Sequence, residues 1–453
     1  MKLKNKKITV IGLGETGVDT AVALKKLGAE VYITEIKNTE EIKKTQTVLE
    51  KQGIKTEIGK HSVEFISGSE LIIPSPGVPL NAFPVLWAKE NNISIKSEIE
   101  IAYQISPSKK IVAITGTNGK TTTTSLTDLL FKNAGLKHVT CGNIGNSFIG
   151  EIEKIKKDTV IILEVSSFQL EYIENFRPYI SALLNITRDH LDYYDTFSQY
   201  VSAKKKIFIN QKEKDIAILN WADPFCKEIG NDLSIKKIYF SSMHDLKDGI
   251  FLKDKKVIYK NNNISIEIAD ISKGKLFGIH NAENIMAVCG IAISFGISSS
   301  IIQKTIEEFI PVSHRIETIA EKEGIIYIDD SKATNIDAVK RALESFSSKK
   351  NIILIMGGKD KGFSFMPLTS LISEKVKYLV LLGQTAERIK DQLKESNVPQ
   401  KIVKTMEEAV VLSSQIGQKG DIVLLSPGCS SFDMFKNYQE RGDVFKRVVQ
   451  SLL

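Results

Sequence analysis

The stretch ITGTNGKTTTT at residues 114–124 contains the residue types of a phosphate-binding loop. The usual pattern is G-x-x-x-x-G-K-[ST]. Gly119, Lys120 and Thr121 match its second half, whereas Ile114 stands where the first glycine is expected. An apolar run precedes the loop and helical apolar spacing follows it, which is the context such a loop requires. Backbone N–H groups at the helix start could bind phosphate oxygens, while the lysine adds positive charge and the threonine hydroxyl suits Mg²⁺.

A second glycine pattern, GLGETG at residues 12–17, matches G-x-G-x-x-G. It follows a predicted strand and opens a predicted helix. The acidic residue Glu35 ends the next strand roughly twenty residues later, as in dinucleotide-binding folds. This context favours nucleotide or pyrophosphate binding over a pure packing role, and it does not by itself specify NAD.

Further polar residues follow apolar strands in the middle of the chain. Glu164 ends one such strand, and Asp189 and His190 follow another. Carboxylates and an imidazole at strand ends beside a phosphate loop could hold Mg²⁺. Taken singly, His190 is better explained as a surface or hydrogen-bonded histidine. Lys204, within SAKKKIF, predicts a solvated helix face when it is read in isolation.

Polar residues also follow the predicted strands of the last third of the chain. They are Arg315 in SHRIE, Asp330, Lys332 and Thr334 in DDSKATN, Lys359 and Lys361 in GGKDKG, and Ser430, Ser431 and Tyr438 in SPGCSSFDMFKNYQERG. Any one of these could belong to an ordinary loop. Their shared position after strands predicts one ligand cleft between the second and third blocks of the chain.

The elements that position these residues alternate between strands and helices, which predicts an α/β protein with mainly parallel sheets flanked by helices. We expect three domains, at 1–105, 106–312 and 313–453. The first and third are predicted to be Rossmann-like and the second to be of the P-loop type. Residues 251–268 predict a small antiparallel section in the second.

Composition excludes several classes of protein. Apolar residues make up 42% and charged residues 25% of the 453 residues, as in ordinary globular proteins. The net charge of +7 comes without a basic stripe, so no nucleic acid partner is expected. The four cysteines show no C-x-x-C spacing. No apolar segment has a membrane-spanning length, and Gly12 and Gly14 interrupt the N-terminal apolar run, so we expect a cytoplasmic protein without membrane insertion.

The motifs GTNGKTTT, EVSSFQLE, NITRDHLD, HNAEN, SHRIE, DDSKATN, GGKDKG and SPGCSSFDMFKNYQERG occur in one order over nearly the whole chain. Together they resemble the Mur ligase family, which builds the peptide stem of bacterial peptidoglycan. The family's phosphate loop also lacks the early glycine. GLGETG with Glu35, the loop IIPSPGV and the C-terminal motif look most like the member that adds D-glutamate. The D-N-P-R motif of the diaminopimelate-adding member is absent from this sequence.

The resemblance implies a role for each matching residue. UDP-N-acetylmuramoyl-L-alanine would contact Gly14, Thr16, Glu35, Ser75, Pro76, Gly77 and Asn143. ATP would contact Gly116, Thr117, Asn118, Gly119, Lys120, Thr121, Thr122, Asn281, Asn284, Arg315 and Asp330. Thr121, Glu164, His190 and a carbamylated Lys204 would hold Mg²⁺, with Lys120, His190 and Lys204 catalytic. D-glutamate would contact Lys332, Thr334, Lys361, Ser431 and Tyr438, the last standing where the family usually has phenylalanine.

The implied reaction is an ATP-dependent amide synthesis through an acyl phosphate. We expect the protein to be a monomer. Three alternatives are open on sequence grounds. A Mur ligase with a different acceptor amino acid would keep the whole motif set. A nicotinamide-dependent dehydrogenase would rest on GLGETG and Glu35 alone, and it would leave the phosphate loop unexplained. A nucleotide sensor without catalysis would conflict with the intact Lys120, Glu164, His190 and Lys204.

Overall fold

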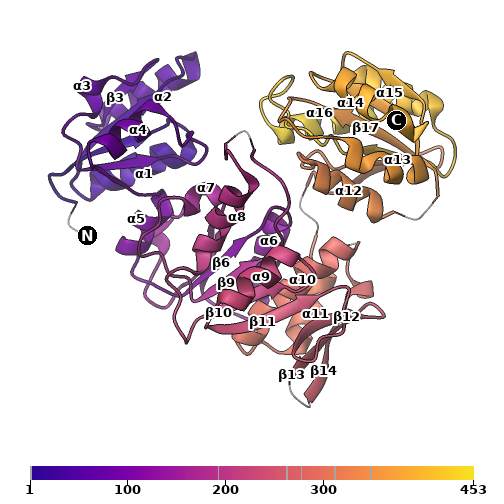
Figure 1. Ribbon diagram of the computed structural model, residues 1–453, viewed down its shortest axis with the longest axis horizontal. Helices are drawn as coiled ribbons and strands as arrows, with labels where there is room; N and C mark the ends of the chain where they lie inside the picture. Colours follow the sequence, from indigo (N-terminus) through magenta and orange to yellow (C-terminus); the bar gives the residue numbers. More distant parts are fainter. Residues whose placement is uncertain are drawn as a thin grey trace. The chain divides into compact units, whose positions relative to one another are not determined.

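The computed structural model describes residues 3–191, 193–261, 264–276, 278–310, 313–346 and 349–452 (Figure 1). These residues form three sheets flanked by helices, so the predicted α/β class is confirmed. The chain divides into two compact units. The first is Met1–Ile186, Tyr193–Asp270 and Glu283–Thr305, and the second is Thr187–Asp192, Ile271–Ala282 and Ile306–Leu453. The domain boundaries after residues 105 and 312 stay a prediction.

The N-terminal sheet has five parallel strands in the order β3-β2-β1-β4-β5. Its strands are β1 (Lys7–Ile11), β2 (Glu30–Glu35), β3 (Lys55–Ile58), β4 (Leu71–Pro74) and β5 (Ser94–Ile95). Its helices are α1 (Glu15–Lys26), α2 (Glu40–Lys51), α3 (Val63–Ile66), α4 (Phe83–Glu90) and α5 (Glu98–Ile105). Ile11 pairs with Pro74 in register, so the loops that follow β1 and β4 lie side by side.

The central sheet has nine strands in the order β14-β13-β12-β11-β10-β9-β6-β8-β7. Its strands are β6 (Ile111–Thr115), β7 (His138–Gly142), β8 (Val160–Glu164), β9 (Ile180–Leu183), β10 (Ile216–Asn220), β11 (Lys236–Ser241), β12 (Gly249–Lys253), β13 (Lys256–Asn261) and β14 (Ile264–Asp270). The last three pair antiparallel, as predicted. Ile114 pairs with Glu164 and Thr115 with Leu183, so β6, β8 and β9 end together.

The helices around this sheet are α6 (Lys120–Asn133), α7 (Ser167–Leu170), α8 (Phe197–Lys205), α9 (Pro224–Asp232), α10 (Ile279–Ser294) and α11 (Ser299–Glu308). Short 3-10 turns occur at η1 (Ile152–Lys154), η2 (Lys206–Phe208) and η3 (Ile271–Lys273). Capping boxes fix the starts of α7 and α8 at Ser166 and Thr196, where each side-chain oxygen accepts the backbone N–H three residues on.

The C-terminal sheet has six strands in the order β15-β16-β20-β17-β18-β19, of which only β15 runs antiparallel to its neighbour. Its strands are β15 (Glu317–Lys322), β16 (Ile325–Asp329), β17 (Ile352–Gly357), β18 (Val376–Leu382), β19 (Gln400–Ile402) and β20 (Ile422–Leu425). Its helices are α12 (Ile336–Glu344), α13 (Thr369–Lys375), α14 (Ala386–Gln392), α15 (Met406–Ile416) and α16 (Tyr438–Ser451), with η4 (Met366–Leu368) and η5 (Lys394–Ser396).

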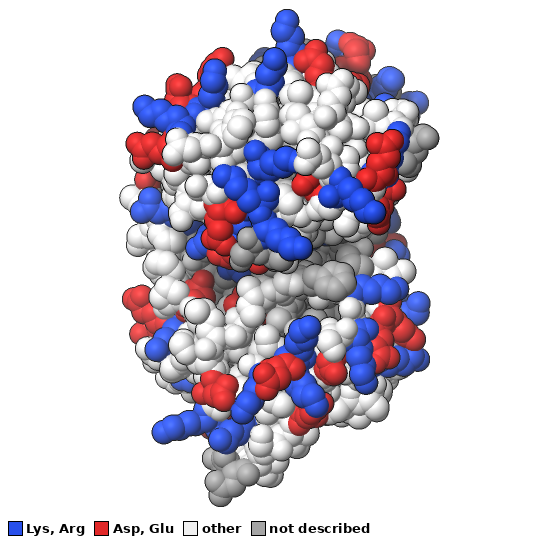
Figure 2. All heavy atoms as spheres, turned by 90° about the vertical axis from the view of Figure 1, so that its right-hand side faces the viewer, with Lys and Arg blue, Asp and Glu red and all other residues white. Residues whose placement is uncertain are grey.

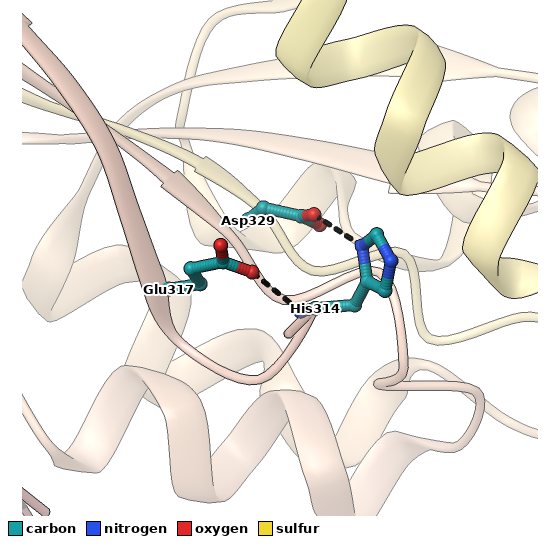
Figure 3. A group of neighbouring side chains, drawn as sticks. All are labelled: His314, Glu317 and Asp329. Atoms are coloured by element: carbon teal, nitrogen blue, oxygen red, sulfur yellow. Dashed lines mark hydrogen bonds and ion pairs between the residues drawn. The ribbon is translucent and has the colours of Figure 1, made fainter. Parts of the chain in front are cut away.

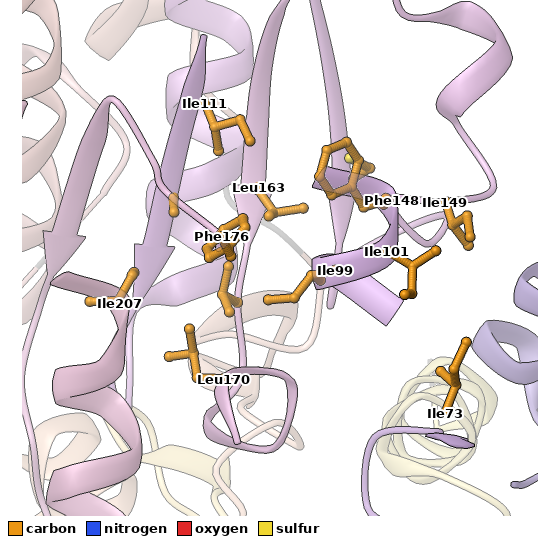
Figure 4. Close-up of a cluster of buried hydrophobic side chains, with 14 of the residues drawn as sticks. Ile73, Ile99, Ile101, Ile111, Phe148, Ile149, Leu163, Leu170, Phe176 and Ile207 are labelled. Carbon is orange, nitrogen blue, oxygen red and sulfur yellow. The ribbon is translucent and has the colours of Figure 1, made fainter. Parts of the chain in front are cut away.

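Helix α5 contributes to the core beneath the central sheet. Ile99 and Ile101 belong to the same buried cluster as Ile111 and Leu163 of β6 and β8 (Figure 4). Between them, the carboxylate of Glu100 is fully buried and one oxygen accepts the backbone N–H groups of residues 174–176 at 2.8 to 2.9 Å. Burial pushes the pKa of Glu100 up, but these hydrogen bonds and one from Gln104 outweigh it and hold the pKa below its usual value.

The four cysteines, Cys141, Cys226, Cys289 and Cys429, are all buried and none forms a disulfide. Burial raises the pKa of each thiol, to about 12 at Cys289 and about 11 at Cys429. Among the described residues, no helix is long and apolar enough to cross a membrane. On the face shown in Figure 2, acidic side chains lie beside basic ones, as the small net charge predicts.

Candidate active site

The phosphate-binding loop lies between β6 and α6. Gly116 and Gly119 have φ angles of +158° and +87°, and a Cβ at Gly119 would lie 2.3 Å from Oδ1 of Asn284. Glycine is therefore required at position 119 by both backbone conformation and space. Ile114, which stands in place of the early glycine, is a fully buried residue of β6. The loop begins at Gly116, one residue after the strand ends.

Two lysine side chains converge on this loop. Nζ of Lys120 donates to the carbonyl oxygens of Gly116 and Thr117 at 2.8 and 2.7 Å. Nζ of Lys204 donates to the same Gly116 oxygen at 2.9 Å, and this lysine is only 1% exposed. The isolated interpretation of Lys204 as part of a solvated helix face is therefore wrong, because α8 turns this one lysine inward. Two cationic groups beside one loop form a suitable environment for an anion.

Glu164 lies at the end of β8, next to β6 in the sheet. Its Oε1 accepts a hydrogen bond from Nδ2 of Asn143 at 2.8 Å, so the structure joins two predicted site residues. Its Oε2 is buried and has no hydrogen-bond partner among the residues that the structure describes. Thr121, in the first turn of α6, is also buried. A buried carboxylate oxygen without a protein partner fits a site for a hard cation such as Mg²⁺.

The N-terminal glycine loop joins β1 to α1. Gly12 has a φ of +99°, and a Cβ at Gly17 would lie 2.0 Å from the Gly12 oxygen, so both glycines serve the tight turn. Gly14 is different: it is exposed, and a Cβ there would meet nothing within 4 Å. Glu35 Oε2 accepts the backbone N–H of Leu13 at 3.1 Å. The carboxylate thus orders the loop, and Gly14 leaves its backbone open to a ligand.

The other residues predicted for the UDP substrate follow β4 or begin α1. Oγ of Ser75 donates to the Gly12 oxygen at 3.3 Å, which ties the two loops together. Gly77 is exposed with a φ of +87°, while Pro76 and Thr16 are half-buried. The structure therefore brings these residues to one edge of the N-terminal sheet, beside the helix start where anions bind. Asn143 is not part of this group, because its side chain is hydrogen-bonded to Glu164 at the end of β8.

The residues predicted for ATP are divided between the two units. Gly116–Thr122 and Asn284 belong to the first, where Oγ1 of Thr123 donates to Oδ1 of Asn284 at 3.3 Å. Asn281, Arg315 and Asp330 belong to the second. Burial raises the pKa of Asp330 to about 7, although a hydrogen bond from Oγ of Ser426 at 2.8 Å opposes this effect.

The residues predicted for D-glutamate follow three strands of the second unit. A β-bridge joins Lys359 to Ser430, so the loops after β17 and β20, which carry Lys361 and the buried Ser431, lie together. Nζ of Lys332 lies 5.0 Å from the ring centroid of Tyr438. Thr334, two residues after Lys332 in the chain, is half-buried.

His190 also belongs to the second unit, whereas Lys120, Glu164 and Lys204 belong to the first. Its backbone N–H donates to Oδ1 of the neighbouring Asp189 at 2.8 Å. Burial pushes the pKa of Asp189 up, but His190, Lys361 and a hydrogen bond from Asn335 together hold it below its usual value.

Comparisons with known proteins cover the whole chain. Residues 6–97 match the family model described as Mur ligase MurD-like, N-terminal domain. Residues 114–292 match the Mur ligase middle domain, and residues 314–429 match the Mur ligase, glutamate ligase domain. The UDP-N-acetylmuramoylalanine--D-glutamate ligase of Koribacter versatilis is 40% identical over 452 residues, which are 100% of this chain and 99% of that protein. The chain belongs to the Mur ligase family.

Other relatives agree with this assignment. The protein of the same name from Thermoanaerobacter sp. is 40% identical to this Mur ligase over the full length of both chains. Among solved structures, a pseudomurein peptide ligase type C from Methanothermus fervidus has a TM-score of 0.63 at 21% identity, covering 99% of this chain and all of that one. The UDP-N-acetylmuramate-alanine ligase MurC from Thermotoga maritima has a TM-score of 0.60 at 22% identity with the same coverage. These structures show that the fold is shared.

Two residues of the SHRIE segment, His314 and Glu317, form with Asp329 a cluster that resembles a metal site in this Mur ligase. Nδ1 of His314 and Oδ2 of Asp329 are 2.7 Å apart, and the His314 backbone N–H donates to Glu317 (Figure 3). The three side chains offer ligand atoms within 4.8 Å of one another. However, Nζ of Lys446 lies 2.8 Å from Glu317 and 3.9 Å from Asp329. We therefore interpret the cluster as a structural ion-pair network, in which the ammonium of Lys446 takes the place that a metal cation would have.

Arg441 is a structural residue of the Mur ligase site that the sequence analysis missed. It is 2% exposed, and its guanidinium donates to Oγ and the carbonyl oxygen of Ser331 at 3.0 and 2.7 Å and to the Cys429 oxygen at 3.1 Å. It thus joins the loops after β16 and β20. The arginine is part of the QERG motif, but the neighbouring residues in the sequence give no indication that its side chain is buried.

Proposed function

We propose that this Mur ligase joins D-glutamate to UDP-N-acetylmuramoyl-L-alanine with cleavage of ATP. The observation that carries the proposal is the full-length match, at about 40% identity, to several ligases that bear this name. The convergence of Lys120 and Lys204 on one glycine loop supports a site for a polyphosphate. The chain would act as a monomer.

The chemical problem is that a carboxylate is a poor electrophile, since its leaving group would be oxide. Transfer of the γ-phosphoryl group of ATP to the carboxylate of the alanyl substrate gives an acyl phosphate. The amine of D-glutamate then attacks the carbonyl carbon, loses a proton and expels inorganic phosphate, which leaves an amide. Catalysis of such transfers depends mainly on positioning and on offsetting negative charge.

Lys120 is proposed to hold the phosphates, since its ammonium already lies on the loop that opens α6. The backbone of Gly116–Gly119, with Thr122, would surround the same phosphates. Asn281, Asn284, Arg315 and Asp330 would hold the rest of ATP. A bound Mg²⁺ would neutralise charge on the phosphates. The orphaned Oε2 of Glu164 supports its placement there, with Thr121, His190 and Lys204 as further ligands.

Lys204 is proposed to carry a carbamate. Its amine would add to carbon dioxide and lose a proton, which turns a buried cation into an anion that can bind metal. Its location supports the proposal, because this lysine is 1% exposed and its Nζ donates to the Gly116 oxygen of the phosphate-binding loop at 2.9 Å.

The substrates are proposed to bind at the remaining strand ends. Gly14, Thr16, Glu35 and Ser75–Gly77 would hold the uridine diphosphate, and Asn143 would orient the alanyl end. Lys332, Thr334, Lys361, Ser431 and Tyr438 would hold D-glutamate. Two lysines suit an acceptor with two carboxylates.

The test is phosphate release from ATP and Mg²⁺ with UDP-N-acetylmuramoyl-L-alanine in bicarbonate buffer. D-glutamate, L-glutamate, L-lysine and diaminopimelate are supplied separately. We expect release with D-glutamate only. Phosphate release with another acceptor would show that this Mur ligase adds a different amino acid. No phosphate release with any acceptor would contradict the ligase proposal.

A further inference from the structure

The loop after β9 is folded onto the C-terminal compact unit. Strand β9 itself belongs to the first unit, but Thr187–Asp192 clusters with the second. Asp189 is a buried acidic residue of this loop that contacts the rest of the unit. It is 5% exposed, and its carboxylate has neighbours from three segments of the chain.

The contacts of the Asp189 carboxylate are of two kinds. Hydrogen bonds come from the backbone N–H of His190 to Oδ1 at 2.8 Å and from Nδ2 of Asn335 to Oδ2 at 3.0 Å. Ion-pair distances join Oδ1 to Nζ of Lys361 at 3.6 Å and Oδ2 to Nε2 of His190 at 3.8 Å. The carboxylate thus lies between the residue proposed for the metal and a lysine proposed for the acceptor.

Asn335 is itself held in a fixed orientation. It is 3% exposed and is the N-cap of α12, where its Oδ1 accepts the backbone N–H of Ala338 at 2.8 Å. With Oδ1 used by the cap, the amide must present its NH₂ group to Asp189. The position of the carboxylate is therefore fixed by the start of a helix, a rigid element of the unit.

The distance to Lys361 matters for what that lysine can do. At 3.6 Å the ammonium is attracted to Asp189 but lies beyond the usual range of an N–H···O bond, about 2.7–3.2 Å. An ammonium has three donors, and an ion pair at this distance orients it while leaving donors for a second anion. A carboxylate of the acceptor is an anion of the right kind.

We propose that Asp189 is a positioning residue. It orients Lys361 toward the acceptor carboxylate and also holds His190 in place. The proposal rests on the proposed function, because it assigns Lys361 to an anionic acceptor amino acid. Asp189 acts through its two neighbours and does not contact the reacting atoms. Loss of its charge is expected to weaken binding of the acceptor far more than binding of ATP.

The test compares Asp189→Asn with Asp189→Glu in the full-length enzyme. We expect the asparagine variant to raise the KM for D-glutamate about tenfold or more, the scale of losing one member of a buried charge pair. The KM for ATP should change less than about twofold, and the glutamate variant should recover most of the loss. Asp391→Asn is a matched control, since Asp391 is an exposed aspartate of α14 in the same unit.

A double variant tests the route through Lys361. If Asp189 acts by aiming this lysine, adding Asp189→Asn to Lys361→Gln should raise the KM for D-glutamate no further. Equal and independent effects of the two changes would overturn the proposal, as would an unchanged KM in Asp189→Asn. Should that variant fail to show a cooperative unfolding transition, Asp189→Ser replaces it in both comparisons.

Failure of the proposed function gives a different result. If the unaltered enzyme releases phosphate only with another acceptor, the assignment of D-glutamate is wrong, and the same KM comparison is made with that acceptor. A KM that then rises in Asp189→Asn supports the positioning role on its own. An enzyme without turnover on any acceptor overturns both proposals.

Discussion

The carbonyl oxygen of Gly116 accepts hydrogen bonds from two ammonium groups, those of Lys120 and Lys204. One carboxylate oxygen of Glu164, by contrast, is buried. The first arrangement concentrates positive charge beside the loop, and the second leaves Oε2 of Glu164 buried without a hydrogen-bond donor among the described residues. Gly116 follows β6 and Glu164 ends β8, and these two strands are neighbours in one sheet. A nucleotide with its metal ion would satisfy both.

Replacing Glu164 tests this complementarity. Glu164→Gln keeps an oxygen for Nδ2 of Asn143 but removes the charge, so the concentration of Mg²⁺ needed for half-maximal phosphate release should rise at least about tenfold. The measurement is a Mg²⁺ titration of the initial rate. Glu90→Gln, at the exposed end of α4, serves as the control. Identical Mg²⁺ curves for the two variants would rule out Glu164 as a metal ligand.

Glu98 predicts a pH effect on stability. Burial raises its pKa to about 7, and the N–H of Ile149, 2.6 Å from Oε1, only partly opposes this. The unfolded value is about 4.3, so between about pH 4 and 7 the folded state binds the extra proton. The contribution of Glu98 to stability is therefore present at low pH and declines as pH rises through this window.

Glu98→Gln removes this dependence, because the amide resembles the protonated acid. We expect the variant to gain up to about 3 kcal/mol relative to the unaltered chain between pH 4 and pH 8. The measurement is urea unfolding at both pH values. Tryptophan fluorescence suits it, since both tryptophans, Trp87 and Trp221, belong to the first unit together with Glu98. A stability difference that is the same at both pH values would contradict the assignment.

At the scale of elements, helix α6 carries two glycines with left-handed backbone, one at each end. Gly119 at its start has φ +87° with Asn284 in the path of a Cβ, whereas Gly135 after its end has φ +68° with open space. Replacing each glycine by alanine therefore distinguishes two costs. Gly135→Ala tests the left-handed backbone alone, and Gly119→Ala adds a steric conflict with Asn284. Gly135→Ala should cost about 1–2 kcal/mol, from the left-handed conformation alone.

Gly119→Ala should cost more than this and should also abolish ATP binding, because Asn284 and the phosphate loop must move apart. Thermal unfolding and titration with ATP measure the two effects. The steric account fails if both alanine variants lose the same stability and both still bind ATP.

The sequence predicted the buried strands well and the edges poorly. IVAIT and VIILE each begin with four consecutive apolar residues, and KITVI is apolar apart from Lys7 and Thr9, as expected of parallel strands covered on both faces. The short or polar edge strands β3, β5 and β19 were not predicted, since KTEI, SI and QKI resemble loops. The interior strands β10 and β11 were missed too, although IAILN is apolar.

The candidate site divides in the same way. Gly119 and Glu164 were predictable because each belongs to a local pattern of strand, loop and helix. The burial of Lys204 was not, because the carbonyl oxygen that accepts its hydrogen bond is 88 residues away in the sequence. Arg441 depends likewise on Ser331, 110 residues away. Contacts of this kind depend on the tertiary fold, so no periodic pattern in the sequence indicates them.

At the scale of the whole molecule, the two compact units should unfold in separable steps, because each has its own buried core. Tryptophan fluorescence reports the first unit only, while far-UV circular dichroism reports both. UDP, proposed to bind at Gly14 and Ser75–Gly77, should raise the midpoint seen by fluorescence and leave the other transition unchanged.

Thermal scans with and without UDP make the measurement, with inorganic phosphate at equal ionic strength as the control. A single transition that shifts equally by both probes would show that the units unfold as one. A fluorescence midpoint that UDP does not move would count against the proposed uridine site.

The four buried thiols have a practical consequence. Because thiolate is the reactive form and burial both covers these sulfurs and raises their pKa, maleimide reagents should find almost nothing to label in the folded chain. A cysteine introduced at exposed Lys60 and another at exposed Lys394 would then be the sites that take dye. One is in each unit, so a donor and an acceptor fluorophore on this nearly blank background would report the distance between the units as each substrate is added.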